Sequence, residues 1–420
     1  MKFLRAGICA LIVFGVAAHG GVEDWARAVL ITGAGLLFLS WSLWLYFNRD
    51  EQPVFSPLLP PLATFSLLVF SQWLFRSTAS PYNTRMELLL LLADLIVLFL
   101  AVQAFRTLED WRGFVWFGMG FGFLVSIFGI LQHLTFNGKL YWIREMHYGG
   151  VPFGPYANRN HFAGFAELIL PLALVPLVLG RVRRERLLVV GLFAVLPIAA
   201  LFFSASRGGI LSFAVELGVL ALVIVWRRTM GKHLLSAAAI MLGALLMVSW
   251  LGVGQILQRF SSMQSLEMTA GKRASMRRDT WRIFRDHPLL GTGLGTIQIV
   301  FPPYETLYDG KIVNHTHNDY LEALAETGLA GGLCCPWFLA VLFAESLKRL
   351  RQFNNSFAGA LQLSGFIACC GFLAHSLVDF NLHIPANAML FFLMAQLATV
   401  DLPQAAPPSP RRRHRNSRND

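Results

Sequence analysis

The sequence predicts an all-α integral membrane protein that crosses the bilayer many times. Hydrophobic residues make up 55% of the 420 residues and charged residues only 14%, with a mean hydropathy of +0.55, whereas soluble chains carry about 25% charged residues. Apolar windows near the ~20 residues that a transmembrane helix needs recur along the chain. One long polar segment, 253–319, interrupts them late in the sequence. We therefore expect about twelve transmembrane helices and one large loop that contains short helices.

The apolar windows divide the chain into four parts. Residues 1–252 carry the first nine expected helices, 253–319 form the large loop with an arginine-rich helix, 320–402 carry the last three helices, and 403–420 are a tail. The tail is proline-rich and then basic, with little to bury, which is typical of disorder. The expected spans are 4–19, 25–47, 57–75, 87–105, 113–134, 162–179, 187–204, 209–226, 234–252, 320–346, 357–378 and 384–400.

Basic residues in the short loops predict the orientation. Arg106 and Arg112, the arginines within 181–186, and the tail from Arg411 onward all fall on one side of the expected spans. The positive-inside rule makes that side cytoplasmic. Both termini are then cytoplasmic, which agrees with an even number of spans, and the large loop lies outside. The net charge of +11 does not indicate nucleic acid, because the basic residues occupy these loops and the tail.

The large loop holds the densest group of arginines outside the tail. The segment KRASMRRDTWRIFRDHPLLGTGLG, residues 272–295, is typical of a helix ended by a His-Pro pair and a glycine-rich turn. Helical spacing places its arginines on two adjacent stripes, one with Arg278, Arg282 and Arg285 and the other with Arg273 and Arg277. This is either an amphipathic helix at the membrane interface or a set of phosphate ligands, to which the guanidinium fork is suited. GTGLG resembles a phosphate-binding loop, but a turn is the simpler interpretation because it follows a helix.

Arg207 lies in an outer turn of a few residues, SASRGG, between two apolar spans. An arginine near the membrane is costly without a partner. It either extends its head group to the outer lipid headgroups or serves as a rigidly held anion ligand.

Two further outer turns carry polar residues. NRNHFAG contains Asn158 and Asn160, which are candidate helix caps, and His161, which either sits at the interface or belongs to a site. HSLVDFNLHIPAN contains Asp379, which either caps a helix or orients a histidine or an arginine.

His317 is the strongest candidate for a catalytic group. Imidazole is the usual proton acceptor when a hydroxyl must become a nucleophile near neutral pH. His315, Asn318 and Asp319 lie beside it, and Glu322 follows at helical spacing. The His-x-His pair alone suggests a metal, but the sequence shows no HExxH-type register. We therefore expect a base or a phosphate contact, with no metal or cofactor; a structural histidine is the alternative.

These motifs resemble the bacterial O-antigen ligases and the related Wzy-type O-antigen polymerases. In that family a histidine and a small polar residue are followed by nine residues and G-x-x-G, which matches His317-Asn318, DYLEALAET and Gly328-Leu329-Ala330-Gly331. SASRGG matches the family's outer-turn arginine motif at Arg207, and Arg273 best matches its second arginine. The similarity covers roughly 155–400.

The resemblance implies metal-independent glycosyl transfer at the periplasmic face of a bacterial inner membrane. The donor would be a glycan linked through pyrophosphate to undecaprenol, and the acceptor a sugar hydroxyl of lipid A–core or another glycan. His317 would deprotonate that hydroxyl, giving inversion. Arg207 and Arg273, helped by one or more of the other loop arginines, Arg277, Arg278 and Arg282, would hold the pyrophosphate. His315, Asn318, Asp319, Asn160, His161 and Asp379 would support the site.

Three functions remain open from the sequence. A ligase moves a finished polymer onto lipid A–core, whereas a polymerase does the same chemistry with another lipid-linked unit as acceptor; the concentration of polar residues in one late loop slightly favours the ligase. A transporter of anionic lipids is a different class. Transporters place charges near the bilayer midplane, often beside internal repeats, and here the charges gather at one face.

Overall fold

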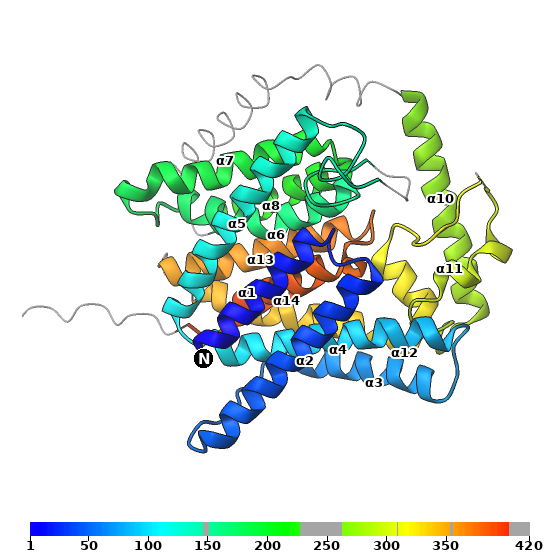
Figure 1. Ribbon diagram of the computed structural model, residues 1–420, viewed down its shortest axis with the longest axis horizontal. Coiled ribbons are helices and arrows are strands. Elements are labelled where there is room, and N and C mark those ends of the chain that lie inside the picture. Colours follow the sequence, from blue (N-terminus) through cyan, green and yellow to red (C-terminus); the bar gives the residue numbers. More distant parts are fainter. Residues whose placement is uncertain (146–150, 227–262, 309, 353–355, 403–420) are drawn as a thin grey trace, which may run out of the picture.

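The computed structural model describes residues 1–145, 151–226, 263–308, 310–352 and 356–402, and its regular structure there is helical (Figure 1). This confirms the expected all-α class. Short 3₁₀ turns η1 to η3 cover Arg184–Arg186, Pro302–Tyr304 and Asn381–His383. The α-helices are α1 (Lys2–Ala17), α2 (Asp24–Phe47), α3 (Leu59–Leu74), α4 (Pro81–Ala104), α5 (Leu108–Leu134), α6 (Arg159–Val178), α7 (Leu187–Ser204), α8 (Arg207–Trp226), α10 (Met263–Asp286), α11 (Ile297–Val300), α12 (Asp319–Arg351), α13 (Phe357–His375) and α14 (Pro385–Thr399).

Eight helical segments in the described ranges are long and apolar enough to cross a membrane. They are α2, α4, α5, α6, η1 with α7, α8, α12 and α13. Three other expected spans correspond to α1, α3 and α14, which have only 16, 16 and 15 residues. Prolines begin two of them, in the first turn of α3 and at Pro385 of α14, because proline suits the first turn of a helix. The expected span 234–252 lies outside the described residues, so twelve crossings are not confirmed.

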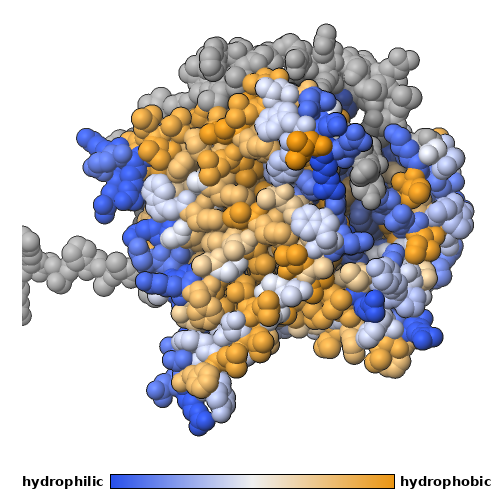
Figure 2. Space-filling view, viewed as in Figure 1, coloured by the Kyte–Doolittle hydropathy of each residue, from blue (hydrophilic) through white to orange (hydrophobic). Residues whose placement is uncertain are grey.

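The helices differ in how deeply they are buried within the bundle. All of the apolar window of α6 is buried, and α13 packs against it, whereas only 17% of the window of α2 is buried. Figure 1 shows α6, α13 and α14 near the middle of the bundle. Figure 2 shows apolar residues across the middle of one face, with hydrophilic residues at the left edge and around α10 and α11 on the right. An apolar belt between polar ends is the surface expected of a membrane-spanning bundle.

Helix α12 is broken at Gly328, which has φ 62° and ψ −163°. The turn before α11 docks into this break: Leu329 N–H donates to Pro288 O at 2.8 Å, and Gly293 N–H donates to Glu326 O at 2.8 Å. A Cβ on Gly328 would come within 2.4 Å of the Leu289 carbonyl carbon. The position therefore requires glycine, both for its positive φ and for the close backbone approach.

The GTGLG segment is a structural turn. Glu326 accepts hydrogen bonds from Gly295 N–H and Ile297 N–H, both at 2.9 Å, and Gln72 accepts one from Leu294 N–H at 3.3 Å. These amide groups are bonded to the protein, so the turn holds α12 against α3 rather than forming a phosphate loop.

Candidate functional site

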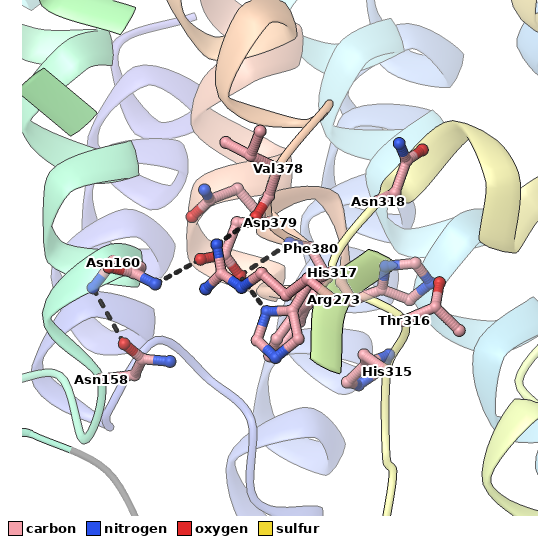
Figure 3. A network of polar contacts seen from close by, with 12 residues as sticks. Asn158, Asn160, Arg273, His315, Thr316, His317, Asn318, Val378, Asp379 and Phe380 are labelled. Carbon is pink, nitrogen blue, oxygen red and sulfur yellow. Dashed lines mark hydrogen bonds and ion pairs between the residues drawn. The ribbon is translucent and has the colours of Figure 1, made fainter. Parts of the chain in front are cut away.

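Five segments that are far apart in the sequence meet at one end of the bundle. The site lies between the N-terminus of α6, the α7–α8 turn, α10, the loop before α12 and the turn between α13 and α14. Figure 3 labels residues from all of these segments except the α7–α8 turn. In Figure 1 this end, marked by α10 and the start of α12, lies away from the N-terminus.

His317 and Asp379 form the central pair. His317 Nδ1 lies 3.1 Å from Asp379 Oδ1, and the aspartate side chain is only 1% exposed. A carboxylate at Nδ1 fixes the ring and its tautomer and leaves Nε2 to take up a proton. Of the roles that the sequence left open for Asp379, this contact matches the orientation of a histidine. The 26% exposure of His317 leaves its ring accessible from outside.

Asp379 is held as a carboxylate. Burial alone would raise its pKa, but the hydrogen bond to His317 and the positive charge of the surrounding histidines lower the pKa well below the usual range of an aspartate. Phe380 N–H donates to Oδ1 at 3.0 Å, and Asn160 Nδ2 donates to Oδ2. Hydrogen bonds to the charged form of a carboxylate favour that form.

The backbone of His317 is strained. Its φ is 53°, in the left-handed region, which costs a non-glycine residue roughly 1–3 kcal/mol and is concentrated at functional sites. The next residues hold this geometry: Asn318 accepts from Leu321 N–H at 2.9 Å and donates to Leu377 O at 3.0 Å. Asp319 N–H donates to Ser376 O at 3.0 Å. The start of α12 is thereby tied to the end of α13.

Asn160 links two of the segments. Its carbonyl accepts a hydrogen bond from Ser206 Oγ at 2.9 Å, while its amide reaches Asp379. The helix cap is the neighbouring Asn158, whose side chain accepts from Asn160 N–H at 2.9 Å. His161 packs its edge on Phe380 at 4.9 Å between ring centroids. Of the two sequence candidates, Asn160 contacts Asp379 directly and His161 belongs to its apolar surroundings.

Arg273 contacts the turn that carries Asp379, and the residue after Arg207 lies close to the same turn. Arg273 donates to Val378 O at 3.1 Å, one residue before the aspartate (Figure 3). Arg207 begins α8, and the adjacent Gly208 lies so close to the turn that a Cβ there would be 2.5 Å from His375 Nε2 and 3.3 Å from Val378 Cγ2. Ser206 caps α8 by accepting from Gly209 N–H at 3.2 Å.

The other predicted arginines lie farther along α10. Arg277 and Arg278 are exposed. Arg282 is half exposed and lies 3.8 Å from Asp279 and 5.9 Å from the Tyr304 ring centroid. Within the described part of the chain, the recorded contacts bring none of the three to His317 or Asp379.

A second cluster, which we call the 315/383 cluster, consists of His315, Asp319, Glu322 and His383. Glu322 Oε1 lies 2.7 Å from His315 Nδ1 and 3.5 Å from His383 Nε2. His383 Nδ1 lies 2.8 Å from Asp319 Oδ1. Burial lowers the pKa of His383, but the charge of Glu322 and the hydrogen bond to Asp319 outweigh it and raise the pKa to about 10.

Sequence reasoning missed Phe380, Ser206 and His383. Phe380 separates the two histidines: its ring stacks on His315 at 4.4 Å and meets His317 edge-on at 5.0 Å. All three residues stand in motifs that had been singled out, SASRGG and VDFNLHIPAN, but spacing along the chain gives no signal of what they face.

An apolar cavity of about 200 Å³ reaches the 315/383 cluster from inside the bundle. Its walls come from α3, α4, α12, α13 and α14, and Asp319 and His383 are among the residues that line it.

The fold and the site thus define a multi-pass all-α membrane protein with a histidine–aspartate pair and arginines at one end of its helices. Residues 192–335 match the family model described as O-antigen ligase, and the chain carries a domain of that family. The match runs from α7 into α12 and includes Arg207, Arg273 and His317. Members of this family are O-antigen ligases and polymerases, glycosyltransferases of glycan assembly that use lipid-linked glycans. No curated protein matches the chain.

Proposed function

We propose that this protein is an O-antigen ligase-type glycosyltransferase. It moves a glycan from undecaprenyl pyrophosphate onto a sugar hydroxyl of lipid A–core at the periplasmic face of the bacterial inner membrane. The observation that carries the proposal is that the turn bearing Asp379, the partner of His317, is also the turn that Arg273 contacts. A proton acceptor and fixed positive charge are the two elements that this transfer requires.

His317 acts as the general base. Its Nε2 takes the proton of the acceptor hydroxyl while the hydroxyl oxygen forms a bond to the anomeric carbon of the donor. The bond between that carbon and the pyrophosphate oxygen breaks on the opposite face, so the configuration is inverted. Asp379 stabilises the imidazolium that results, and its buried, hydrogen-bonded carboxylate is suited to that role.

Arg207 and Arg273 stabilise the departing pyrophosphate. Guanidinium groups bind phosphate oxygens through paired N–H donors, and donors fixed before the reaction stabilise charge without reorganisation. Arg277, Arg278 and Arg282 extend the positive charge along α10, where they meet the donor as it approaches. No metal ion is assigned to the transfer step.

The surroundings suit a lipid-linked substrate. The apolar cavity beside the 315/383 cluster offers a hydrocarbon chain a place within the bundle. The short loops rich in arginine favour a cytoplasmic N-terminus, and the site lies at the opposite end in Figure 1. Both observations support a periplasmic site.

Purified protein in detergent tests the activity. With a lipid-pyrophosphate glycan and lipid A–core present, we expect transfer by the wild type and by His287→Ala, an exposed residue at the end of α10, and none by His317→Ala. Transfer in the absence of a membrane would also exclude pure transport.

A deletion strain separates ligase from polymerase. Retention of long lipid-linked polymer with unmodified lipid A–core supports the ligase. Accumulation of single lipid-linked units would instead identify a polymerase.

A further inference from the structure

The 315/383 cluster lies across Phe380 from His317 and has no part in the proposed transfer step. His315, Glu322 and His383 each offer one ligand atom, and these atoms lie within 4.8 Å of one another. His315 comes from the loop before α12, Glu322 from its first turn and His383 from η3. Three segments therefore direct one carboxylate and two imidazoles toward a common point.

The residues around these groups hold them in place. Thr316 donates to Glu322 Oε2 twice, from N–H at 2.7 Å and from Oγ1 at 3.0 Å. This leaves Oε1 facing the two histidines. Asp319 Oδ1 engages His383 Nδ1 at 2.8 Å, so that Nε2 faces Glu322. A carboxylate behind a ligating histidine is the usual outer shell of a metal site.

We propose that His315, Glu322 and His383 bind a divalent transition-metal ion, with zinc as the best fit. Two imidazoles and one carboxylate are a donor set that zinc uses, with metal–ligand distances of about 2.0–2.2 Å. Tetrahedral geometry at that length separates the ligand atoms by roughly 3.3–3.6 Å. The distance of 3.5 Å between Glu322 Oε1 and His383 Nε2 already fits. His315 Nδ1, at 2.7 Å from Oε1, needs a small rotation of its ring.

Such an ion would brace the segment that carries His317. It joins the loop before α12, at His315, and the first turn of α12, at Glu322, to η3, which ends at His383. The metal therefore acts as a structural clamp at one edge of the site. The sequence analysis expected no metal because no HExxH-type register is present, and His383, which completes this donor set, lies far along the chain.

The test uses full-length protein purified in detergent with a tag that contains no histidine. Elemental analysis should find about one zinc per chain in the wild type and in His287→Ala. His383→Ala and Glu322→Gln should lower occupancy at least ~10-fold, and Asp319→Asn should weaken affinity by about 10–100-fold, as expected for an outer-shell carboxylate.

Cobalt substitution decides the matter even if those variants do not fold. Wild type loaded with Co²⁺ should show visible d–d bands typical of four-coordinate cobalt, and added Zn²⁺ should abolish them. Wild type that contains no metal and binds neither ion would overturn the proposal. The proposal would also be overturned if His383→Ala kept its zinc and eluted like the wild type in gel filtration. The ion would then be bound elsewhere in the protein.

Discussion

The two histidines on either side of Thr316 offer an instructive comparison. His315 and His317 are equally exposed, at 26% of the side chain, and each places Nδ1 beside a buried carboxylate. Their carboxylates differ. Glu322 also meets His383 and Thr316, whereas Asp379 lies next to Val378, which Arg273 contacts. The proposed role of each ring therefore follows from the charges near its carboxylate rather than from exposure. The predictions below are ordered by the size of the expected effect.

Replacing His317 should have the largest effect on transfer. His317→Ala removes the proposed proton acceptor, and we expect the rate to fall by about 10²–10⁴-fold with insertion into the membrane unchanged. His315→Ala, the matched control across Phe380, should lower the rate by no more than ~10-fold. Initial rates with purified variants measure both. A greater loss at His315 than at His317 would reverse the assignment of the base.

Asp379→Asn should lower the rate by roughly 10²-fold or more, because an amide cannot stabilise the imidazolium and does not select the same tautomer. The Michaelis constant for the acceptor should change little, since Asp379 is buried behind His317. Steady-state kinetics separate the two parameters. An unchanged rate with a raised Michaelis constant would mean that Asp379 serves acceptor binding instead.

Arg207→Lys should lower the rate by about 10–10²-fold, because lysine keeps the charge but loses the paired donors of the guanidinium fork. The same substitution at Arg278, which is exposed on α10, is the matched control. Competition by inorganic pyrophosphate reports the binding side of the effect. Equal activity of the two lysine variants would support the alternative that Arg207 only extends to lipid headgroups.

Gly328→Ala should destabilise the protein by at least about 1–3 kcal/mol, since alanine meets a positive φ and a backbone contact at once. Gly310→Ala is the control. Gly310 is exposed and also has a positive φ, but an added Cβ there has no neighbour within 4 Å, so this variant measures the cost of the backbone conformation alone. Thermal unfolding in detergent compares them. If both variants lost the same amount of stability, the contact between Gly328 and the docked turn would contribute nothing to the cost of the substitution.

Arg282→Ala should have the smallest effect, no more than ~3-fold on the rate, because this half-exposed side chain already contacts Asp279 and Tyr304. The same assay measures it. A loss as large as that of Arg207→Lys would place the donor farther along α10 than we propose.

Local chemistry made much of this site predictable. The helical class follows from composition, and His317, Asp379 and Arg273 stand out because polar residues are rare in an apolar chain. The contacts of Phe380 and His383 were not predictable, since they depend on how α12 and α13 pack across more than sixty residues of sequence. Hydropathy windows likewise do not show where α3 and α14 begin, because the prolines in their first turns lie inside apolar runs.

The break in α12 divides the helix into two stretches that have different neighbours. Asp319 to Thr327 is anchored sideways, to the end of α13 and to the turn before α11, while the stretch after Gly328 runs on through the apolar belt. Because the backbone is not helical at Gly328, the direction of each stretch is set by its own neighbours. We therefore expect the distance between His317 and Asp379 to change little when the thickness of the surrounding bilayer is altered.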